Sequence, residues 1–416
     1  MSVPQTVSKP DITADKPSVV SKTASAIKAS NAGFGHGVIK TSTSRALQQF
    51  IANYTGPTPH LVVELDIVER NYKALKNALP QAHHHYAIKA NPHPDLLKRL
   101  QHLGCFFECA SIQEIDMCLA AGAQAKDILY GNPLKKASEI KAAFERGIEQ
   151  FVFDAALELD KIITHAPGAK VVCRITTDGS GAISPLSIKF GCPPDKAIEW
   201  LIKANDNGLI PHGISFHTGS QQLNPKSWDA PIHAAASIFD ALADRGISSM
   251  SVLDVGGGFP TNYRKVVPPI DTFCDAIAHY VDTYFKDKKK PLIYTEPGRY
   301  LPADAGFILA EVVLVAPSHT NPDIRWVYLD IGRYGGLVET QIDYPVYTHH
   351  EGPTGPVIMA GQTCDSNDVI YAEEFRYHLP NALAPGDRVI LAHTGVYTTT
   401  YSTTLNGFPN LTSECI

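Results

Sequence analysis

Residues 85–132 read HYAIKANPHPDLLKRLQHLGCFFECASIQEIDMCLAAGAQAKDILYGN, and this stretch decides the fold class. Three short apolar strands end in polar or glycine residues, and segments with helix-like apolar spacing separate them. The same alternation continues to residue 295. The eight predicted strands are His85–Ala90, Phe106–Ser111, Ile128–Asn132, Phe151–Asp154, Val171–Thr176, Gly213–His217, Ser251–Val255 and Leu292–Thr295. Eight β/α units over roughly 210 residues predict an α/β fold of the (β/α)8 TIM-barrel type. A doubly wound sheet is the alternative.

The pattern changes after about residue 305. Apolar runs separated by Pro, Gly, Asn and Asp predict a second, C-terminal β-rich domain, which Leu61–Leu65 is expected to join. Its predicted strands are Ile308–Val315, Trp326–Leu329, Val357–Met359 and Arg388–Ala392. The domain plan is therefore a flexible or subunit-wrapping N-terminal tail over 1–45, a barrel over 60–305, and a β-rich domain from 46–59 plus 306–416.

Composition narrows the function classes. The 416 residues carry a formal net charge of −6, which argues against a nucleic-acid or membrane-surface binder. No apolar run is long enough for a transmembrane helix. The eight cysteines form no CxxC pair and several lie in apolar runs, so we expect reduced core residues in a cytoplasmic protein. The tail is basic and Ser-rich but has no arginine before Arg45, which favours a tail or arm over a transit peptide.

Polar residues gather at the C-terminal ends of the predicted barrel strands, the face that carries the active site in barrel enzymes. They are Lys89, Glu108, Arg174, His217, Gly256–Gly258 and Glu296. Each placement alone is weak evidence, and their coincidence on six different strands is the stronger signal. We therefore expect one site at this face.

Two of these strand ends have alternative readings. Lys89 is either a lysine that extends from a strand end into solvent or a Schiff-base lysine, whose amine needs a desolvated site to be nucleophilic near neutral pH. The glycines 256–258 are either a flexible loop or bare backbone that a phosphate can approach. Their spacing is neither a dinucleotide fingerprint nor a nucleotide P-loop, so NAD and ATP are not favoured.

The segment EPGRY over 296–300 is either a surface turn or a site in which Glu296 faces a ring nitrogen and Arg299 binds phosphate. His217 offers a flat ring for stacking on a cofactor, and Ser220 a further phosphate donor. The run His83–His85 alternates faces within a strand and has no carboxylate cluster, so no metal is expected there.

The second domain contributes one candidate loop, GQTCDSND over 361–368. It is either an ordinary turn rich in Asn and Asp, or a site in which Cys364 transfers a proton and Asp365 binds a cationic substrate end. Tyr397 could add one more hydroxyl for a phosphate.

The motifs YAIKAN (86–91), FHTGS (216–220), DVGGGFP (254–260), EPGRY (296–300) and TCDS (363–366) occur here in one order. This ordered series resembles the fold-type III, pyridoxal-phosphate-dependent basic amino acid decarboxylases, which act on ornithine, lysine, diaminopimelate or arginine. The resemblance runs from about Leu61 to Phe408. It implies an alanine-racemase-like barrel, pyridoxal 5'-phosphate as cofactor, and a homodimer with shared active sites.

The resemblance also implies residue roles. Lys89 would form the Schiff base with the cofactor, His217 would stack on its ring, and Glu296 would pair with the ring nitrogen. The residues matching Cys364 and Asp365 would enter the site from the neighbouring subunit. The phosphate would be held by Ser220, Gly256–Gly258, Arg299 and Tyr397. Arg174, Lys189 and Glu108 fall where the family has supporting residues, the last of them near the substrate.

The substrate stays open between ornithine, giving putrescine for polyamine biosynthesis, and lysine, giving cadaverine. TCDS favours these two over diaminopimelate, and the stretch Gly332–Tyr344 resembles bacterial ornithine/lysine enzymes. Two positions depart from the family pattern: Ile331 stands where eukaryotic ornithine decarboxylases have Asp, and Leu405 where an aromatic residue is usual. Alternatives are diaminopimelate decarboxylation, another reaction on the same cofactor, and a decarboxylase-like regulatory protein that only binds a partner.

Overall fold

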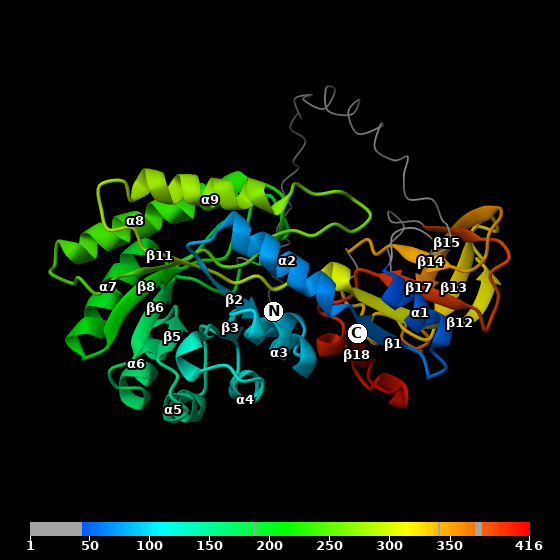
Figure 1. Ribbon diagram of the computed structural model, residues 1–416, viewed down its shortest axis with the longest axis horizontal. Coiled ribbons are helices and arrows are strands. Elements are labelled where there is room, and N and C mark those ends of the chain that lie inside the picture. The colour runs from blue at the N-terminus through cyan, green and yellow to red at the C-terminus, as the bar shows by residue number, and fades with distance from the viewer. Residues whose placement is uncertain (1–43, 187, 340–341, 371–376) are drawn as a thin grey trace, which may run out of the picture.

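A computed structural model describes residues 44–416 except 187, 340–341 and 371–376, so most of the expected tail over 1–45 lies outside the described residues. Figure 1 shows two bodies side by side, an α/β barrel and a β-rich domain. Among the described residues, no helix has the length and apolarity needed to cross a membrane.

The predicted barrel is confirmed. Eight parallel strands close in the order β10-β11-β2-β3-β4-β5-β6-β8. Their bounds are β2 His83–Ala87, β3 Phe106–Cys109, β4 Ile128–Tyr130, β5 Gln150–Phe153, β6 Lys170–Arg174, β8 Ile210–Ser215, β10 Val252–Asp254 and β11 Leu292–Thr295. The surrounding helices are α2 Leu65–Ala78, α3 Pro94–His102, α4 Ile112–Ala120, α5 Ala137–Glu145, α6 Ala156–His165, α7 Pro194–Asp206, α8 Asp229–Ala243 and α9 Ile270–Tyr284. All but the last predicted strand extended too far at the C-terminal end, because the chain leaves the sheet there to form the site loops.

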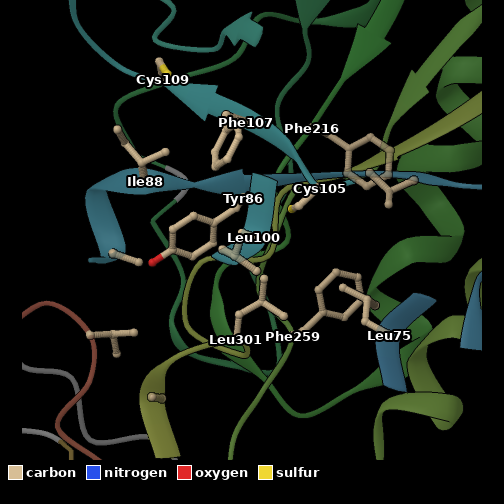
Figure 2. Packing of buried hydrophobic residues seen from close by; sticks show 14 of the residues in the cluster. Leu75, Tyr86, Ile88, Leu100, Cys105, Phe107, Cys109, Phe216, Phe259 and Leu301 are labelled. Carbon is tan, nitrogen blue, oxygen red and sulfur yellow. The ribbon is translucent and has the colours of Figure 1, made fainter. Parts of the chain in front are cut away.

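The barrel strands are apolar on both faces, as parallel strands covered by helices must be. Inside the barrel, Leu129, Val152 and Val172 pack with Val252 and Tyr294. A second layer lies between the strands and the helices. Figure 2 shows part of that layer, including Tyr86 of β2, Phe107 of β3, Leu100 of α3 and Leu301. This packing fixes β2, the strand that leads into Lys89.

The histidine run of β2 alternates faces as expected. The rings of His83 and His85 both pack against Tyr294, with centroid distances of 5.7 and 4.2 Å. His84 points to the other face, where its Nδ1 hydrogen bonds Thr295 Oγ1 at 2.8 Å. These contacts give the run a packing role in the barrel wall.

The β-rich domain is also confirmed. In the described part of the chain its sheet contains eight strands. They are β1 His60–Val63, β12 Gly306–Pro317, β13 Arg325–Leu329, β14 Val346–Thr348, β15 Thr354–Ala360, β16 Tyr377–Pro380, β17 Arg388–Ala392 and β18 Thr412–Cys415. Strand β1 pairs with β12 and β18, as expected for Leu61–Leu65. The barrel therefore starts after Val63 and not at residue 60. Helix α1, Arg45–Asn53, covers this sheet through Leu47.

Candidate active site

A cavity of about 900 Å³ opens at the C-terminal ends of the barrel strands and continues against the β-rich domain. Most of the residues predicted for the site line it. They are Lys89, Glu108, Arg174, His217, Ser220, Gly258, Glu296, Arg299 and Tyr397. Lys189, expected to support the site, lines it as well. The ends of six barrel strands thus meet at one cavity, as the sequence predicted.

Lys89 lies just past β2, in a short 3₁₀ turn over Ile88–Ala90 and not within a strand. Its Nζ is 3.4 Å from Oε2 of Glu108, a buried carboxylate at the end of β3. This carboxylate is the main reason why the pKa of Lys89 is raised, and it outweighs the effect of burial. In this structure the charge of Glu108 affects the pKa of Lys89 more than desolvation does. Glu108 lies close enough to accept a proton from the amine.

Two further carboxyl groups belong to this site: Glu296 lines the cavity, and Asp254 is fully buried. Burial raises the pKa of Glu296 well above its usual value, and the neighbouring Asp254 raises it further. Burial likewise raises the pKa of Asp254 to about 6. Burial therefore favours the protonated form of Glu296, and a proton held there can be shared with a basic ring nitrogen in the cavity.

His217 follows β8 and is a neutral imidazole. Its Nδ1 accepts a hydrogen bond from the Gly219 N–H at 3.0 Å, so that nitrogen carries no proton. Burial, together with the positive charges of Arg174 and Lys89, lowers the pKa of His217 to about 3. A flat, uncharged ring of this kind is suited to stacking on an aromatic cofactor.

The glycine segment 256–258 leaves no room for side chains. A Cβ on Gly257 would lie 2.5 Å from the Glu296 carbonyl oxygen and 3.3 Å from Nε2 of His217. At Gly258, where φ is +96°, a Cβ would lie 2.3 Å from the Gly219 carbonyl oxygen. Of the three glycines, Gly258 lines the cavity, whereas Gly256 and Gly257 are not part of its lining.

The expected phosphate donors meet at one corner of the cavity. Nε of Arg299 donates to Ser220 Oγ at 3.2 Å, and its guanidinium lies 5.0 Å from the centre of the Tyr397 ring. Sequence reasoning missed a partner of this arginine, since Glu339 from the β-rich domain forms two hydrogen bonds with it. Glu339 stands in the stretch that resembles bacterial enzymes, but nothing in the sequence paired it with Arg299.

An apolar rim at the cavity was also missed. Leu134, Leu186 and Ile188 line the cavity and are largely exposed, and Tyr401 joins them from the β-rich domain. The cations of Arg174 and Lys189 lie over the ring of Phe190, at 5.3 and 4.9 Å from its centre. Each of these residues reads as an ordinary loop residue until the fold brings the loops together.

Cys364 and Asp365 do not line the cavity of their own chain. Cys364 is exposed, and the side-chain oxygen of Asn406 accepts hydrogen bonds from its N–H at 3.0 Å and from its thiol at 3.4 Å. Tyr334 donates to Asp365 at 3.1 Å. A backbone hydrogen bond from Asn367 is the main cause that lowers the pKa of Asp365, which is therefore ionised. The loop is ordered by its own contacts but lies outside this cavity.

The two departures from the family pattern lie in different surroundings. Ile331 is buried in the apolar core, with 1% of its surface exposed. It can offer no polar contact to a ligand. Leu405 is partly exposed and precedes Asn406, the residue that holds Cys364.

Comparison with known proteins agrees with this geometry. Residues 65–303 match the family described as "Pyridoxal-dependent decarboxylase, pyridoxal binding domain". The lysine/ornithine decarboxylase of Selenomonas ruminantium is 35% identical over 85% of this chain and 88% of its own length. Antizyme inhibitor 2 of Xenopus laevis is 33% identical over 82% of this chain and 77% of its own.

Among solved structures, the lysine/ornithine decarboxylase of Vibrio vulnificus complexed with cadaverine has a TM-score of 0.79 and 31% identity. The match covers 89% of this chain and 97% of that one. The same enzyme was also solved with putrescine, with a TM-score of 0.78. The chain described here belongs to the pyridoxal-dependent decarboxylase family.

The cofactor of this family is pyridoxal phosphate, and the cavity fits it. Glu296 offers a proton to a ring nitrogen, His217 a neutral face, and Lys89 an amine. The glycine segment leaves space that any Cβ would fill. Arg299, Ser220 and Tyr397 supply polar hydrogens at one end, as a phosphate requires.

Proposed function

We propose that this protein decarboxylates a basic L-amino acid, with L-ornithine as the preferred substrate and L-lysine also accepted. One observation carries the proposal: Lys89, Glu296, His217 and Arg299 line or surround a single cavity in a member of the pyridoxal-dependent decarboxylase family. The products would be putrescine and cadaverine. The names of the Selenomonas and Vibrio relatives pair the same two amino acids.

Pyridoxal phosphate, when bound, supplies an aldehyde for amines and a ring that withdraws electrons from the α carbon. The chain's own groups prepare this chemistry. Glu108 lies beside Lys89 and would take its proton when the amine reacts. Glu296 would keep a proton at the ring nitrogen, which would strengthen the electron withdrawal. His217 would cover one face of the ring without adding a charge.

Proton delivery to the product is assigned to Cys364, and recognition of the substrate's distal ammonium to Asp365. Neither lines the cavity of its own chain, and both stand on an exposed loop of the β-rich domain. A homodimer in which this loop enters the partner's cavity would complete the site. The ionised state of Asp365 suits a cationic substrate end.

The preference for ornithine over lysine is expected to be modest. With Ile331 buried, that position supplies no second carboxylate to fix the distance of the ammonium. One methylene in such a pocket is worth about 1–3 kcal/mol of discrimination. Both substrates should therefore be turned over by the same protein.

The test is CO2 release by the purified, cofactor-supplied dimer with L-ornithine, L-lysine, L-arginine and meso-diaminopimelate. We expect ornithine and lysine to react within about a hundredfold of each other in kcat/KM, since one methylene separates them. Release from diaminopimelate alone would replace this proposal with diaminopimelate decarboxylation. Loss of substrate chirality without CO2 would indicate racemisation on the same cofactor.

A second candidate follows from the similarity to antizyme inhibitor 2: a decarboxylase-like protein that binds a regulator and makes no product. The arrangement of Lys89 against Glu108, with Glu296 lining the same cavity, speaks for catalysis. Absence of both cofactor absorbance and CO2 release in pyridoxal-phosphate-supplied protein would favour the binding role.

We also propose a reducing, cytoplasmic location. All eight cysteines are free, and six of them are buried. Two buried pairs, Cys109 with Cys118 and Cys173 with Cys192, have sulfurs 3.6 Å apart and are not bridged. Reduced thiols this close together are expected in the cytosol. Thiol counting on protein isolated with a rapid blocking reagent would test this.

A further inference from the structure

Arg299 is held in the cavity wall by hydrogen bonds. It is 4% exposed, and three side chains hydrogen bond with its guanidinium. Nε donates to Ser220 Oγ at 3.2 Å, and Nη1 donates to the Tyr263 hydroxyl at 2.8 Å. Glu339 accepts from Nη1 at 2.9 Å and from Nη2 at 2.6 Å.

One N–H group of Arg299 remains for a ligand. A guanidinium has five N–H groups in one plane. Ser220, Tyr263 and Glu339 together take four of them, and among the described residues the fifth, on Nη2, has no partner. Glu339 takes the Nη1–Nη2 edge, so the free N–H lies on the opposite edge, beside Nε and Ser220. The Ser220 hydroxyl accepts from Arg299 and keeps its own hydrogen for the same direction.

Glu339 is the contact that fixes this orientation. Ser220 and Tyr263 each make one hydrogen bond, which leaves the plane free to tilt. A carboxylate bound at two points sets the plane of an arginine. Glu339 comes from the β-rich domain, so the arginine of the barrel is aimed by a residue of the other domain.

We propose that Glu339 is a positioning residue for the cofactor phosphate, acting through Arg299: it holds the guanidinium so that one N–H of Nη2 and the Ser220 hydroxyl point together into the cavity. The inference rests on the proposed role of Arg299 in binding that phosphate. It assigns Glu339 no contact with the substrate or with the reacting atoms.

The ion pair of Arg299 and Glu339 is neutral overall. The phosphate would therefore be held here by directed hydrogen bonds more than by net charge. The opposite reading makes Glu339 a stand-in anion that leaves when the phosphate arrives. The two readings predict opposite effects when the carboxylate is removed.

The experiment compares pyridoxal phosphate with pyridoxal, which lacks the phosphate. Both are titrated into apoprotein, and the ratio of the two dissociation constants measures the phosphate's contribution alone. Glu339→Gln is expected to lower this preference for pyridoxal phosphate about tenfold, the loss of one charge-assisted hydrogen bond. Arg299→Ala is expected to lower it further. A general loosening of the site would weaken both ligands equally and leave the ratio unchanged.

Two variants sharpen the result. Glu339→Asp keeps the charge but is one methylene too short to reach both nitrogens, so we expect it to behave like Glu339→Gln. It also serves if Glu339→Gln does not fold. Asp343→Asn is the matched control, because Asp343 pairs with Arg264 at 3.1 Å in the same stretch and lies outside the cavity lining. That variant should keep the wild-type ratio.

Three results would overturn the inference. A rise in phosphate preference in Glu339→Gln would make Glu339 the stand-in anion. An unchanged ratio would make its role merely structural. Wild-type behaviour of Glu339→Asp would show that charge matters and orientation does not. The proposed function fails separately, since wild-type protein that shows no preference for pyridoxal phosphate would refute the role of Arg299 itself.

Discussion

The cavity at the barrel's strand ends and the loop that carries Cys364 are built in opposite ways. Lys89, His217 and Glu296 each follow a barrel strand, and these strands bring the three residues to one cavity. The packing of the strands in the core fixes where each strand ends. The Cys364 loop is closed by a backbone hydrogen bond between Gly361 and Asp368, and Cys364 itself is exposed. The residues proposed to hold the cofactor thus meet at one cavity of a single chain, whereas the candidate proton donor Cys364 does not line that cavity. Cofactor binding should therefore be a property of one chain, and turnover a property of two.

The largest effect is expected from a substitution in the barrel cavity. Lys89→Ala should abolish turnover, because no other amine in the described cavity lies beside Glu108 as Lys89 does. CO2 release from ornithine measures it, with circular dichroism to confirm folding. A variant that still released CO2 at the normal rate would show that Lys89 is not the essential amine of the site.

Mixing two inactive chains tests the contrast directly. Lys89→Ala and Cys364→Ala should each be nearly inactive, and together they should recover about a quarter of wild-type activity. Random exchange makes half of the dimers hybrid, and each hybrid holds one intact site. Equal amounts are mixed, exchange is confirmed by differently tagged subunits, and CO2 release is measured. Confirmed exchange without recovery would show that the Cys364 loop does not serve the partner's cavity.

Glu296→Gln should reduce kcat by roughly a hundredfold or more, the usual size of a lost proton-holding group. The amide can still hydrogen bond a ring nitrogen but cannot give it a proton. Affinity for pyridoxal phosphate, measured by titration, should change much less than kcat. An equal loss in both would make Glu296 a binding residue and weaken the electronic role given to it.

Sequence predicted the barrel well because its signal is local. A strand such as Leu292–Thr295 is apolar on both faces and ends in the polar residues of the site. The ends of the strands were harder to predict. Ile88 and Ala90 continue the apolar pattern of β2, but they lie in a 3₁₀ turn that begins after the strand has ended. The pairing of Arg299 with Glu339 could not be predicted, because it depends on how the second domain returns to the barrel. The exposure of Cys364 was not visible in its motif either.

On the loop's side of the contrast, Asp365→Asn should lower kcat/KM for ornithine by roughly thirtyfold, or about 2 kcal/mol, because a charged hydrogen bond to the substrate ammonium is weakened. Its carboxylate is already ionised and held by Tyr334, so little rearrangement is expected. Affinity for pyridoxal phosphate should not change. A variant that lost affinity for the cofactor but kept its kcat/KM per cofactor-bound site would show that Asp365 serves cofactor binding and not substrate binding.

The wall that supports the cavity is expected to affect folding stability and its dependence on pH, through the buried His85. Burial lowers the pKa of His85 to about 3, from an ordinary value of 6.5. Below pH 6.5 His85 binds a proton in the unfolded chain but not in the folded one. Its contribution to the stability of the folded state is therefore fully present above pH 6.5 and is lost as the pH falls toward 3. At pH 5 the loss is about 2 kcal/mol, from 1.36 kcal/mol per pH unit. His85→Phe, which keeps a flat ring beside Tyr294, should remove that part of the decrease in unfolding free energy between pH 7 and pH 5. Denaturant unfolding at the two pH values measures it, and an identical decrease in both proteins would show that the acid sensitivity of the barrel arises elsewhere.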